Sequence, residues 1–169
     1  SRLEAGAWKP AKDWCDVADI IATVLDRLPD GTAARVAVAV PPDLPLIRAD
    51  YIQIALVVQN LLENAAKYTP VESAIEVAAQ VAINGDSVVL TVRDYGEGIT
   101  PGEEKELFTR FFRGARHRSG AVHGTGLGLA LCDAVVRAHG GTISAYNAPP
   151  DEPGGAIFSF SLPIDTEDP

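Results

Sequence analysis

The sequence feature that most constrains the fold is a long helix, predicted from Asp50 to about Tyr68. Asp50 is a candidate N-cap, with Gln53 at the spacing of a capping box. The helix should end before Pro70, because a proline disfavours helical geometry in the residue that precedes it. Its apolar positions predict a helix that packs against a core: Ile52, Ile54, Leu56, Val57, Val58, Leu61, Leu62 and Ala65.

Shorter elements surround this helix and predict a two-layer α/β domain in which helices cover a sheet. Asn84-Gly85-Asp86 indicates a tight hairpin between two strands, and Asp30-Gly31 is interpreted as a turn. Further helices are expected over 16–28, 103–108 and 128–139. Strands are expected over 35–40, 46–48, 74–82, 87–93, 142–147 and 156–162.

Composition limits the partners that such a domain can have. The 169 residues fit one domain, and 14 basic against 23 acidic side chains give a net charge of −9. That charge argues against a surface for nucleic acid or anionic lipid. Cys15 and Cys132 form no CxxC pair, so neither structural zinc nor a disulfide framework is expected. No apolar run approaches the roughly 20 residues that span a bilayer.

One stripe of the long helix is polar. Asn60, Asn64 and Lys67 follow one another at i, i+4 and i+7, which places them on one face. A solvated face explains such a stripe by itself, because polar residues are common on exposed helix surfaces. The alternative is a ligand site, since asparagine oxygens suit Mg²⁺ and a lysine suits a phosphate beside it.

A second candidate feature is Asp94-Tyr95-Gly96-Glu97-Gly98, directly after a predicted strand. Aspartate and glycine are common in turns, so an ordinary turn is one interpretation. In the other, the Asp94 carboxylate accepts a hydrogen bond from an exocyclic amine, and the glycines let the backbone approach a ligand. Adenine offers that amine, whereas guanine offers a carbonyl that the carboxylate would repel.

Two further segments suit anions. Gly124-Thr125-Gly126-Leu127-Gly128-Leu129 comes at a predicted helix start, where N–H groups and the helix dipole attract negative charge. It lacks the strand that precedes a dinucleotide fingerprint and the lysine of a Walker A loop. Before it, residues 107–118 carry three phenylalanines and four arginines, which fit phosphate contacts or a basic loop that docks on an acidic partner.

The four features occur in this order, and together they resemble the ATP-binding catalytic domain of two-component sensor histidine kinases. That family shares an ATPase superfamily with DNA gyrase, Hsp90 and MutL. The resemblance covers about residues 46–163 and implies the Bergerat fold, an α/β (α+β) two-layer sandwich. Its mixed, mostly antiparallel sheet is expected to be covered on one face by about three helices. Residues 2–7, 63–70 and 140–163 are similar to the Kdp-type potassium-sensing branch.

The resemblance also implies ATP and Mg²⁺ as cofactors and a role for each matching residue. Asn64 is implied as the Mg²⁺ ligand, Asn60 as its support, and Lys67 and Arg113 as catalytic phosphate contacts. In the related ATPases a hydrolytic carboxylate takes the place of Asn60, so vigorous ATP hydrolysis is not expected here. The further nucleotide contacts implied are Tyr68, Asp94, Gly96, Gly98, Ile99, Phe112, Gly124, Thr125, Gly126, Leu127, Gly128 and Leu129.

The phosphate acceptor of such kinases is a histidine on an upstream dimerisation helix, and His117, His123 and His139 do not match it. We therefore expect residues 1–8 to end that helix and its linker, 9–163 to form the catalytic domain, and 164–169 to be a flexible acidic tail. The start without Met fits a piece of a longer protein, and the N-terminus does not fit a signal peptide.

The partners implied are the chain's own histidine phosphotransfer domain and a response regulator, with no nucleic acid and a monomeric fragment. The fragment is expected on the cytoplasmic side of a protein anchored in the bacterial inner membrane. The alternatives are a related serine kinase of the anti-sigma kind, an ATP-gated clamp like Hsp90, and a degenerate binding module that has lost its nucleotide.

Overall fold

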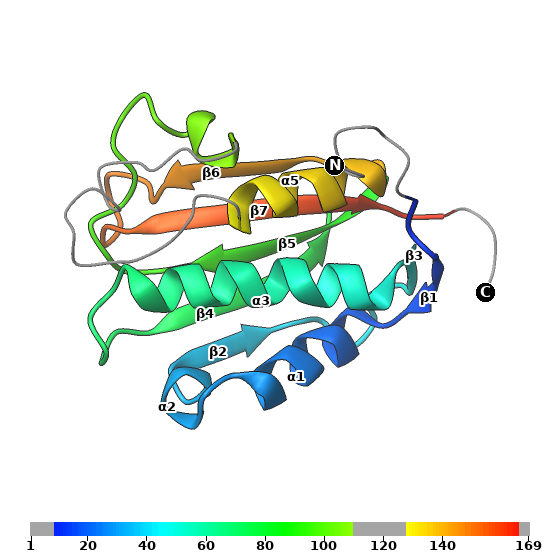
Figure 1. The fold of residues 1–169 in the computed structure, drawn as a ribbon, viewed down its shortest axis with the longest axis horizontal. Coiled ribbons are helices and arrows are strands. Elements are labelled where there is room, and N and C mark those ends of the chain that lie inside the picture. Colours follow the sequence, from blue (N-terminus) through cyan, green and yellow to red (C-terminus); the bar gives the residue numbers. More distant parts are fainter. Residues whose placement is uncertain (1–8, 110–127, 166–169) are drawn as a thin grey trace.

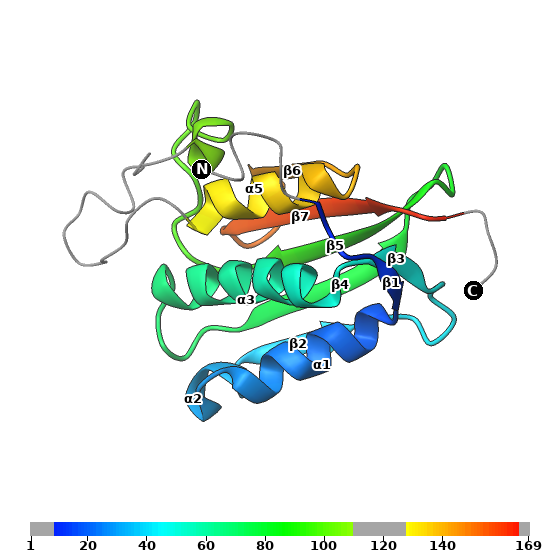
Figure 2. The ribbon, with the colours of Figure 1, turned by 45° about the vertical axis from the view of Figure 1, so that its right-hand side comes forward.

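The computed structural model describes residues 9–109 and 128–165. They form a two-layer α+β sandwich, in which α1 (Val17–Arg27), α3 (Tyr51–Lys67) and α5 (Gly128–Ala138) cover one face of a sheet (Figure 1). Helix α3 lies between α1 and α5, as the turned view also shows (Figure 2). The five strands of the sheet are, in spatial order, β2 (Val36–Ala39), β4 (Ile75–Val81), β5 (Ser87–Arg93), β7 (Ala156–Pro163) and β6 (Ile143–Asn147).

The pairing of the strands confirms the predicted mixed, mostly antiparallel sheet. Strand β2 runs parallel to β4, while the pairs β4–β5, β5–β7 and β7–β6 are antiparallel. The hairpin between β4 and β5 turns at Gly85, whose φ of 78° favours glycine. Strand β5, in the middle of the sheet, ends at Arg93, which places the next residue, Asp94, beside the start of β7.

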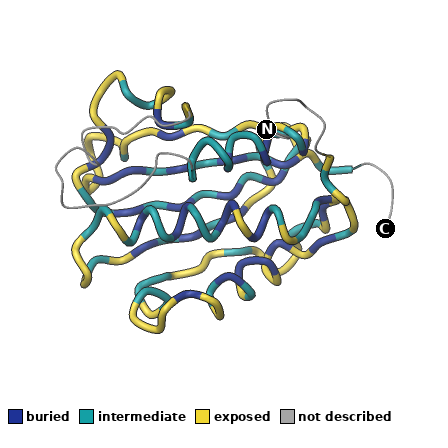
Figure 3. The backbone as a smooth tube through the Cα atoms, viewed as in Figure 1, coloured by how far each residue is buried: buried dark blue, intermediate teal, exposed yellow. Residues whose placement is uncertain are grey.

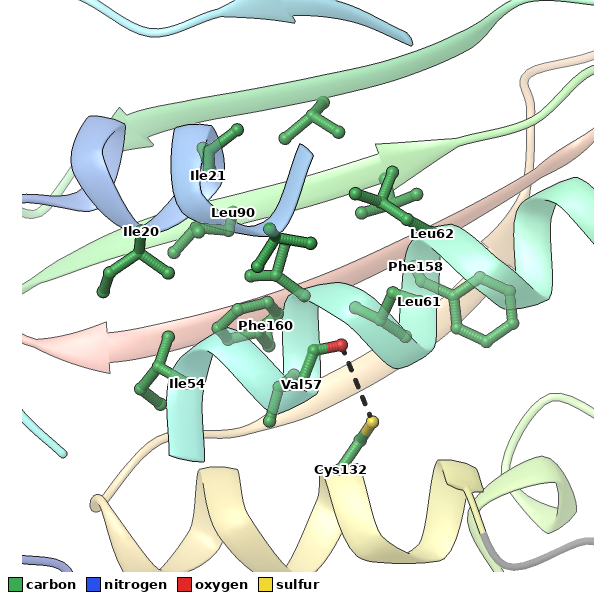
Figure 4. Packing of buried hydrophobic residues seen from close by; sticks show 14 of the residues in the cluster. Ile20, Ile21, Ile54, Val57, Leu61, Leu62, Leu90, Cys132, Phe158 and Phe160 are labelled. Carbon is green, nitrogen blue, oxygen red and sulfur yellow. Dashed lines mark hydrogen bonds between the residues drawn. The ribbon is translucent and has the colours of Figure 1, made fainter. Parts of the chain in front are cut away.

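The core lies between the helices and the sheet, where buried positions alternate along β4, β5 and β7 (Figure 3). Phe158 and Phe160 of β7 and Leu90 of β5 point from the sheet toward Leu61 and neighbouring residues of α3 (Figure 4). Helices α3 and α5 also contact each other directly, since the Cys132 thiol donates to the carbonyl of Val57 at 3.9 Å (Figure 4). Burial raises the pKa of Cys132 to about 12.

Three short elements differ from the expectation. The link before α1 contains a strand, β1 (Asp13–Cys15), which pairs with β3 (Ile47–Ala49), a strand shifted by one residue from its predicted place. The predicted turn at Asp30-Gly31 is the start of a four-residue helix, α2 (Asp30–Ala33). The expected helix over 103–108 is reduced to a 3-10 turn, η1 (Glu106–Phe108). Residues 1–8 and 166–169, with their expected roles as linker and tail, lie outside the described residues.

Asp50 joins three parts of the chain at the start of α3. Its Oδ1 accepts from the N–H of Gln53 at 3.2 Å, which confirms the predicted cap, and its Oδ2 accepts from the N–H of Ala11 at 2.9 Å. Its own N–H donates to Nε2 of His139 at 3.0 Å. The N-terminal link, α3 and the end of α5 are thereby fixed to one another. Of the helices described, none is both long and apolar enough to cross a bilayer.

His139, the residue directly after α5, is buried in its neutral form. Its side chain is 3% exposed, Nδ1 donates to the carbonyl of Val135 at 2.8 Å, and Nε2 accepts from Asp50. Those two bonds require the neutral ring. Burial lowers the pKa of His139, the nearby charge of Lys12 lowers it further, and the Val135 bond and Asp50 act in the opposite direction.

Candidate functional site

The polar stripe of α3 lies on the side that meets the start of α5. Asn60 is half-buried, and its Nδ2 donates to the carbonyl of Leu56 at 2.9 Å. Its Oδ1 therefore points to α5, where a Cβ added to Gly128 would lie 2.9 Å away. Asn64 is half-buried, its side chain makes no hydrogen bond to another described residue, and Lys67 in the last turn is exposed. The stripe thus passes from a packed contact to solvent along the helix.

Asp94 is the most deeply buried acidic side chain in the described part of the chain, with 1% exposure. Its Oδ1 accepts two backbone hydrogen bonds, from the N–H of Gly96 at 3.0 Å and from the N–H of Ala156 at 3.1 Å. Its own N–H donates to the carbonyl of Ala156 at 2.9 Å. Because the carboxylate is fixed by two backbone segments, it presents a rigid acceptor at the end of β5.

The loop after Asp94 packs against the end of α3. A Cβ on Gly96 would lie 2.6 Å from the carbonyl oxygen of Tyr68 and 3.0 Å from Cγ2 of Thr69, so only glycine allows this approach. The N–H of Tyr68 donates to the carbonyl of Asn64 at 3.3 Å, which closes the helix. The structure therefore brings together two features that lie about 30 residues apart in the sequence, the polar stripe of α3 and the loop of Asp94.

Arg35 fixes the chain that leaves α3, and no motif in the sequence pointed to it. Its Nη2 donates to Oγ1 of Thr69 at 2.5 Å and to the carbonyl of Pro70 at 2.9 Å, and its Nε donates to the carbonyl of Ser73 at 2.8 Å. The carbonyl of Arg35 also accepts from the N–H of Ile75, where β2 and β4 begin to pair. A lone arginine before a short strand gives no signal from which this role could be inferred.

The opposite face of the sheet supports the Asp94 loop from behind. The Tyr95 hydroxyl donates to Glu76 of β4 at 2.5 Å, and the Arg93 guanidinium lies over the Tyr95 ring at 4.6 Å. Arg93 also forms an ion pair with Glu152 at 2.8 Å. The bond to Glu76 raises the pKa of Tyr95, and the bond to Glu152 raises the pKa of Arg93. Successive side chains alternate across the sheet, so Tyr95 is directed away from the side that Asp94 faces.

The far end of the loop is buried. Gly98 has a φ of 83°, which favours glycine, and Ile99 is 3% exposed. Phe108, the last residue of η1, packs edge-on against Phe158 with the ring centroids 6.2 Å apart. Leu129, in the first turn of α5, is half-buried against the same core.

Several of the predicted nucleotide contacts lie in segments that the structure does not describe. Phe112, Arg113 and residues 124–127 lie outside the described residues. The predicted nucleotide contacts that are described gather around the C-terminal half of α3, the end of β5 and the start of α5: Asn60, Asn64, Lys67, Tyr68, Asp94, Gly96, Gly98, Ile99, Gly128 and Leu129.

A family comparison agrees with this geometry. Residues 49–166 match the family of histidine kinase-, DNA gyrase B-, and HSP90-like ATPases. The match covers well over half of the 169 residues, and the chain belongs to this family of ATP-binding domains.

The relatives of the chain are sensor histidine kinases. The sensor protein KdpD of Escherichia coli (strain K12) is 38% identical over 166 residues, which are 98% of this chain and 18% of that protein. KdpD of Clostridium acetobutylicum is 40% identical over 129 residues, which are 76% of this chain and 14% of that protein. The mycobacterial sensor histidine kinase MprB superposes with a TM-score of 0.77 at 30% identity, over 90% of this chain and 97% of that structure.

Within the family, the chain is therefore an ATP-binding catalytic domain of the sensor histidine kinase type. It spans less than a fifth of the length of the two KdpD relatives. A structure of full-length ShkA in complex with AMPPNP superposes with a TM-score of 0.80 at 27% identity, over 99% of this chain and 34% of that structure.

Proposed function

We propose that this domain binds MgATP and donates the γ-phosphoryl group to a histidine on an upstream helical domain. The observation that carries the proposal is the contact between Gly96 and the carbonyl of Tyr68. It places a rigid buried carboxylate beside the end of a helix that carries two asparagines and a lysine on one stripe. An acceptor for a base and a set of groups for phosphates and a metal then border one site.

Asp94 supplies the contact that selects the base. A carboxylate accepts from the exocyclic amine of adenine, while the carbonyl of guanine offers no donor at that place. Gly96, Gly98 and Ile99 border the base, and Tyr68 lies beside the nucleotide. The two N–H groups at Oδ1 fix the carboxylate before any ligand arrives, so little reorganisation opposes binding.

The residues of the stripe fit Mg²⁺ and phosphate. The described residues contain no group of three His, Cys, Asp or Glu side chains that could hold a metal ion, so Mg²⁺ would enter with the phosphate oxygens of ATP. Asn64, half-buried and without a partner among the described side chains, is the ligand that the chain offers, with Asn60 in support and Lys67 at a phosphate. When bound, Mg²⁺ would neutralise charge on the β- and γ-phosphates.

The chain's own groups favour transfer over hydrolysis. Asn60 is an amide whose Nδ2 is engaged by the Leu56 carbonyl, so no carboxylate general base stands at this place to activate water. In the transfer, an imidazole nitrogen attacks the γ-phosphorus, the bond to the β,γ-bridging oxygen breaks, and ADP leaves. The proposed site is completed by Arg113 and Phe112, and by the phosphate contacts that the sequence predicts: Gly124, Thr125, Gly126, Leu127, Gly128 and Leu129.

The parent protein would carry the remaining steps. The histidine phosphate would pass to an aspartate of a response regulator, and residues 9–163 would form the catalytic domain that serves both. The two KdpD relatives support a place in the Kdp-type, potassium-responsive branch. We propose a cytoplasmic position for this domain in a protein of the inner membrane, and a monomeric state for the fragment.

Calorimetric titration of ATP, with and without Mg²⁺, tests the proposal. Wild type should bind ATP more tightly with Mg²⁺, and Asn64→Ala should remove most of that gain. Gln59→Ala is the matched control, because Gln59 is an amide of the same helix whose Nε2 contacts Glu63 instead. If folded wild-type protein binds no ATP, or if Mg²⁺ has the same effect on Asn64→Ala, the proposed site is wrong. Transfer of label from γ-phosphate to the parent protein's upstream helical domain then tests the kinase step.

A further inference from the structure

The loop after Asp94 is held at its far end by Asn147, the last residue of β6. The side-chain amide of Asn147 pairs with both polar backbone atoms of Ile99. Its Oδ1 accepts from the N–H of Ile99 at 2.7 Å, and its Nδ2 donates to the carbonyl of Ile99 at 2.9 Å. The two bonds resemble the pair of hydrogen bonds between two residues of a β-ladder, with a side-chain amide in the place of one backbone. Such pairing needs a donor and an acceptor on the same group.

The backbone of the loop is shaped to admit this side chain. A Cβ on Gly98 would lie 2.5 Å from Oδ1 of Asn147, and the φ of 83° at Gly98 is unfavourable for other residues. The glycine that the sequence motif assigns to the ligand therefore also makes room for Asn147.

The end of the β6–β7 hairpin holds both ends of the loop that follows Asp94. Asn147 is paired in register with Ala156, whose N–H donates to Oδ1 of Asp94. Gly155, next to it, approaches so closely that an added Cβ would lie 2.0 Å from the carbonyl oxygen of Asp94. The distance between the Asp94 carboxylate and Ile99 is thus set by the end of the β6–β7 hairpin.

We propose that Asn147 is a positioning residue for nucleotide binding, which holds Ile99 and Gly98 at a fixed place relative to Asp94. The inference rests on the proposed function, because the loop concerned is the one that would receive adenine. Without the amide, the far end of the loop loses two hydrogen bonds and has to be ordered when the base binds. Affinity then falls although Asn147 itself does not touch the nucleotide.

Asn147→Asp separates this role from general stability, because its effect depends on pH. The ionised carboxylate cannot donate to the carbonyl of Ile99 and repels it, so ATP affinity should fall roughly tenfold at pH 8. The protonated carboxyl has one donor and one acceptor, as the amide does, so the pairing is restored. The carbonyl oxygen of Ile99 raises the pKa of such a carboxyl group, and the N–H of Ile99 lowers it. Because the carboxyl group takes up its proton as the pH approaches that pKa, the ratio of the variant's Kd to that of wild type should move toward 1 between pH 8 and pH 5.

Two further variants make the measurement specific. Asn147→Ala should lose a similar factor at both pH values, since alanine cannot be rescued by protonation. Asn84→Asp is the matched control, because Asn84 lies in the exposed β4–β5 turn and accepts only a local bond from the N–H of Asp86. Its Kd ratio to wild type should stay near 1 throughout. Asn147 is an exposed residue whose side chain bonds to Ile99, so these variants are expected to fold, and thermal melts at each pH verify this.

The outcomes are distinct. Affinity lost at pH 8 and regained at pH 5 in Asn147→Asp supports the positioning role. Unchanged affinity at pH 8, or an equal loss at both pH values in the folded variant, overturns it while the proposed function stands. Failure of folded wild type to bind ATP overturns the proposed function, and the inference with it.

Discussion

Replacing Asp94 by asparagine tests the assignment of the base contact, because the change exchanges one oxygen for an NH2 group. The asparagine can keep its oxygen at the place of Oδ1, where the N–H groups of Gly96 and Ala156 require an acceptor. The NH2 group then stands where the second carboxylate oxygen was. It presents a donor to the donor of adenine, so the contact is lost while the local fold is retained.

The expected loss of ATP affinity follows from the hydrogen bonds that the substitution changes. A hydrogen bond to an ionised acceptor contributes about 1.5–3 kcal/mol, and a buried donor without an acceptor costs about 1–3 kcal/mol. ATP binding should therefore weaken by about 3 kcal/mol or more, which is a loss of at least roughly a hundredfold in affinity. The two backbone bonds at Oδ1 become bonds to a neutral acceptor, and each weakens by about 1 kcal/mol. That predicts a Tm lower by roughly 4–8 °C.

Calorimetry at 20 °C with ATP and GTP, together with thermal melts, measures both quantities. Asp86→Asn is the matched control, because Asp86 is exposed in the β4–β5 turn and its loss should change neither nucleotide binding nor Tm appreciably. The preference for ATP over GTP should shrink in Asp94→Asn, since its NH2 group suits the carbonyl of guanine. A folded Asp94→Asn variant that binds ATP within threefold of wild type would refute the assignment.

Three further predictions concern stability and reactivity. Gly155→Ala should destabilise the domain by about 3 kcal/mol, because the φ of 123° at this position is strained for alanine and the added Cβ would overlap the Asp94 carbonyl. Gly31→Ala is the control: a Cβ added there meets nothing within 4 Å, so the free energy of unfolding should change by less than about 1 kcal/mol. Since burial lowers the pKa of His139, its stabilising effect is complete above the unfolded value of about 6.5 and is lost as pH falls through the folded pKa. When the pH is lowered from 8 to 5.5, the free energy of unfolding in urea should therefore decrease less for His139→Gln than for wild type. Cys132, with its pKa raised to about 12, should react with Ellman's reagent only after unfolding in urea; a fast reaction of this thiol in the native protein would contradict its burial.

Local signals predicted the elements that form from neighbouring residues. The cap at Asp50 and the proline at position 70 located α3, and Asn84-Gly85 located the β4–β5 hairpin. These signals act within a few residues, so the sequence contains them in full. The order of the strands, with β2 parallel to β4 at one edge, depends on pairing between distant segments, and no local pattern predicts it.

Strand β1 and helix α2 had no local signal of that strength. Strand β1 has three residues and is held by pairing with β3 and by Arg48, which lies over the Trp14 ring at 5.9 Å. Asp30-Gly31 suits both a turn and the first residues of a short helix, and tertiary packing decides between them.

The candidate site was predicted as a set of residue types and not as an arrangement. The spacing of Asn60, Asn64 and Lys67 indicated the stripe, and the glycines after Asp94 indicated the loop. The residues that hold these parts in place, Arg35 and Asn147, act through backbone atoms far away in the sequence. Their side chains bear no catalytic chemistry, so no motif marks them.

A structure of the chain with a non-hydrolysable ATP analogue and Mg²⁺ is the decisive test of the proposed site. We expect the exocyclic amine of adenine within hydrogen-bond distance of the Asp94 carboxylate, and the metal beside the amide oxygen of Asn64. A nucleotide bound elsewhere on the domain, or one whose adenine amine faces away from Asp94, would contradict the proposal.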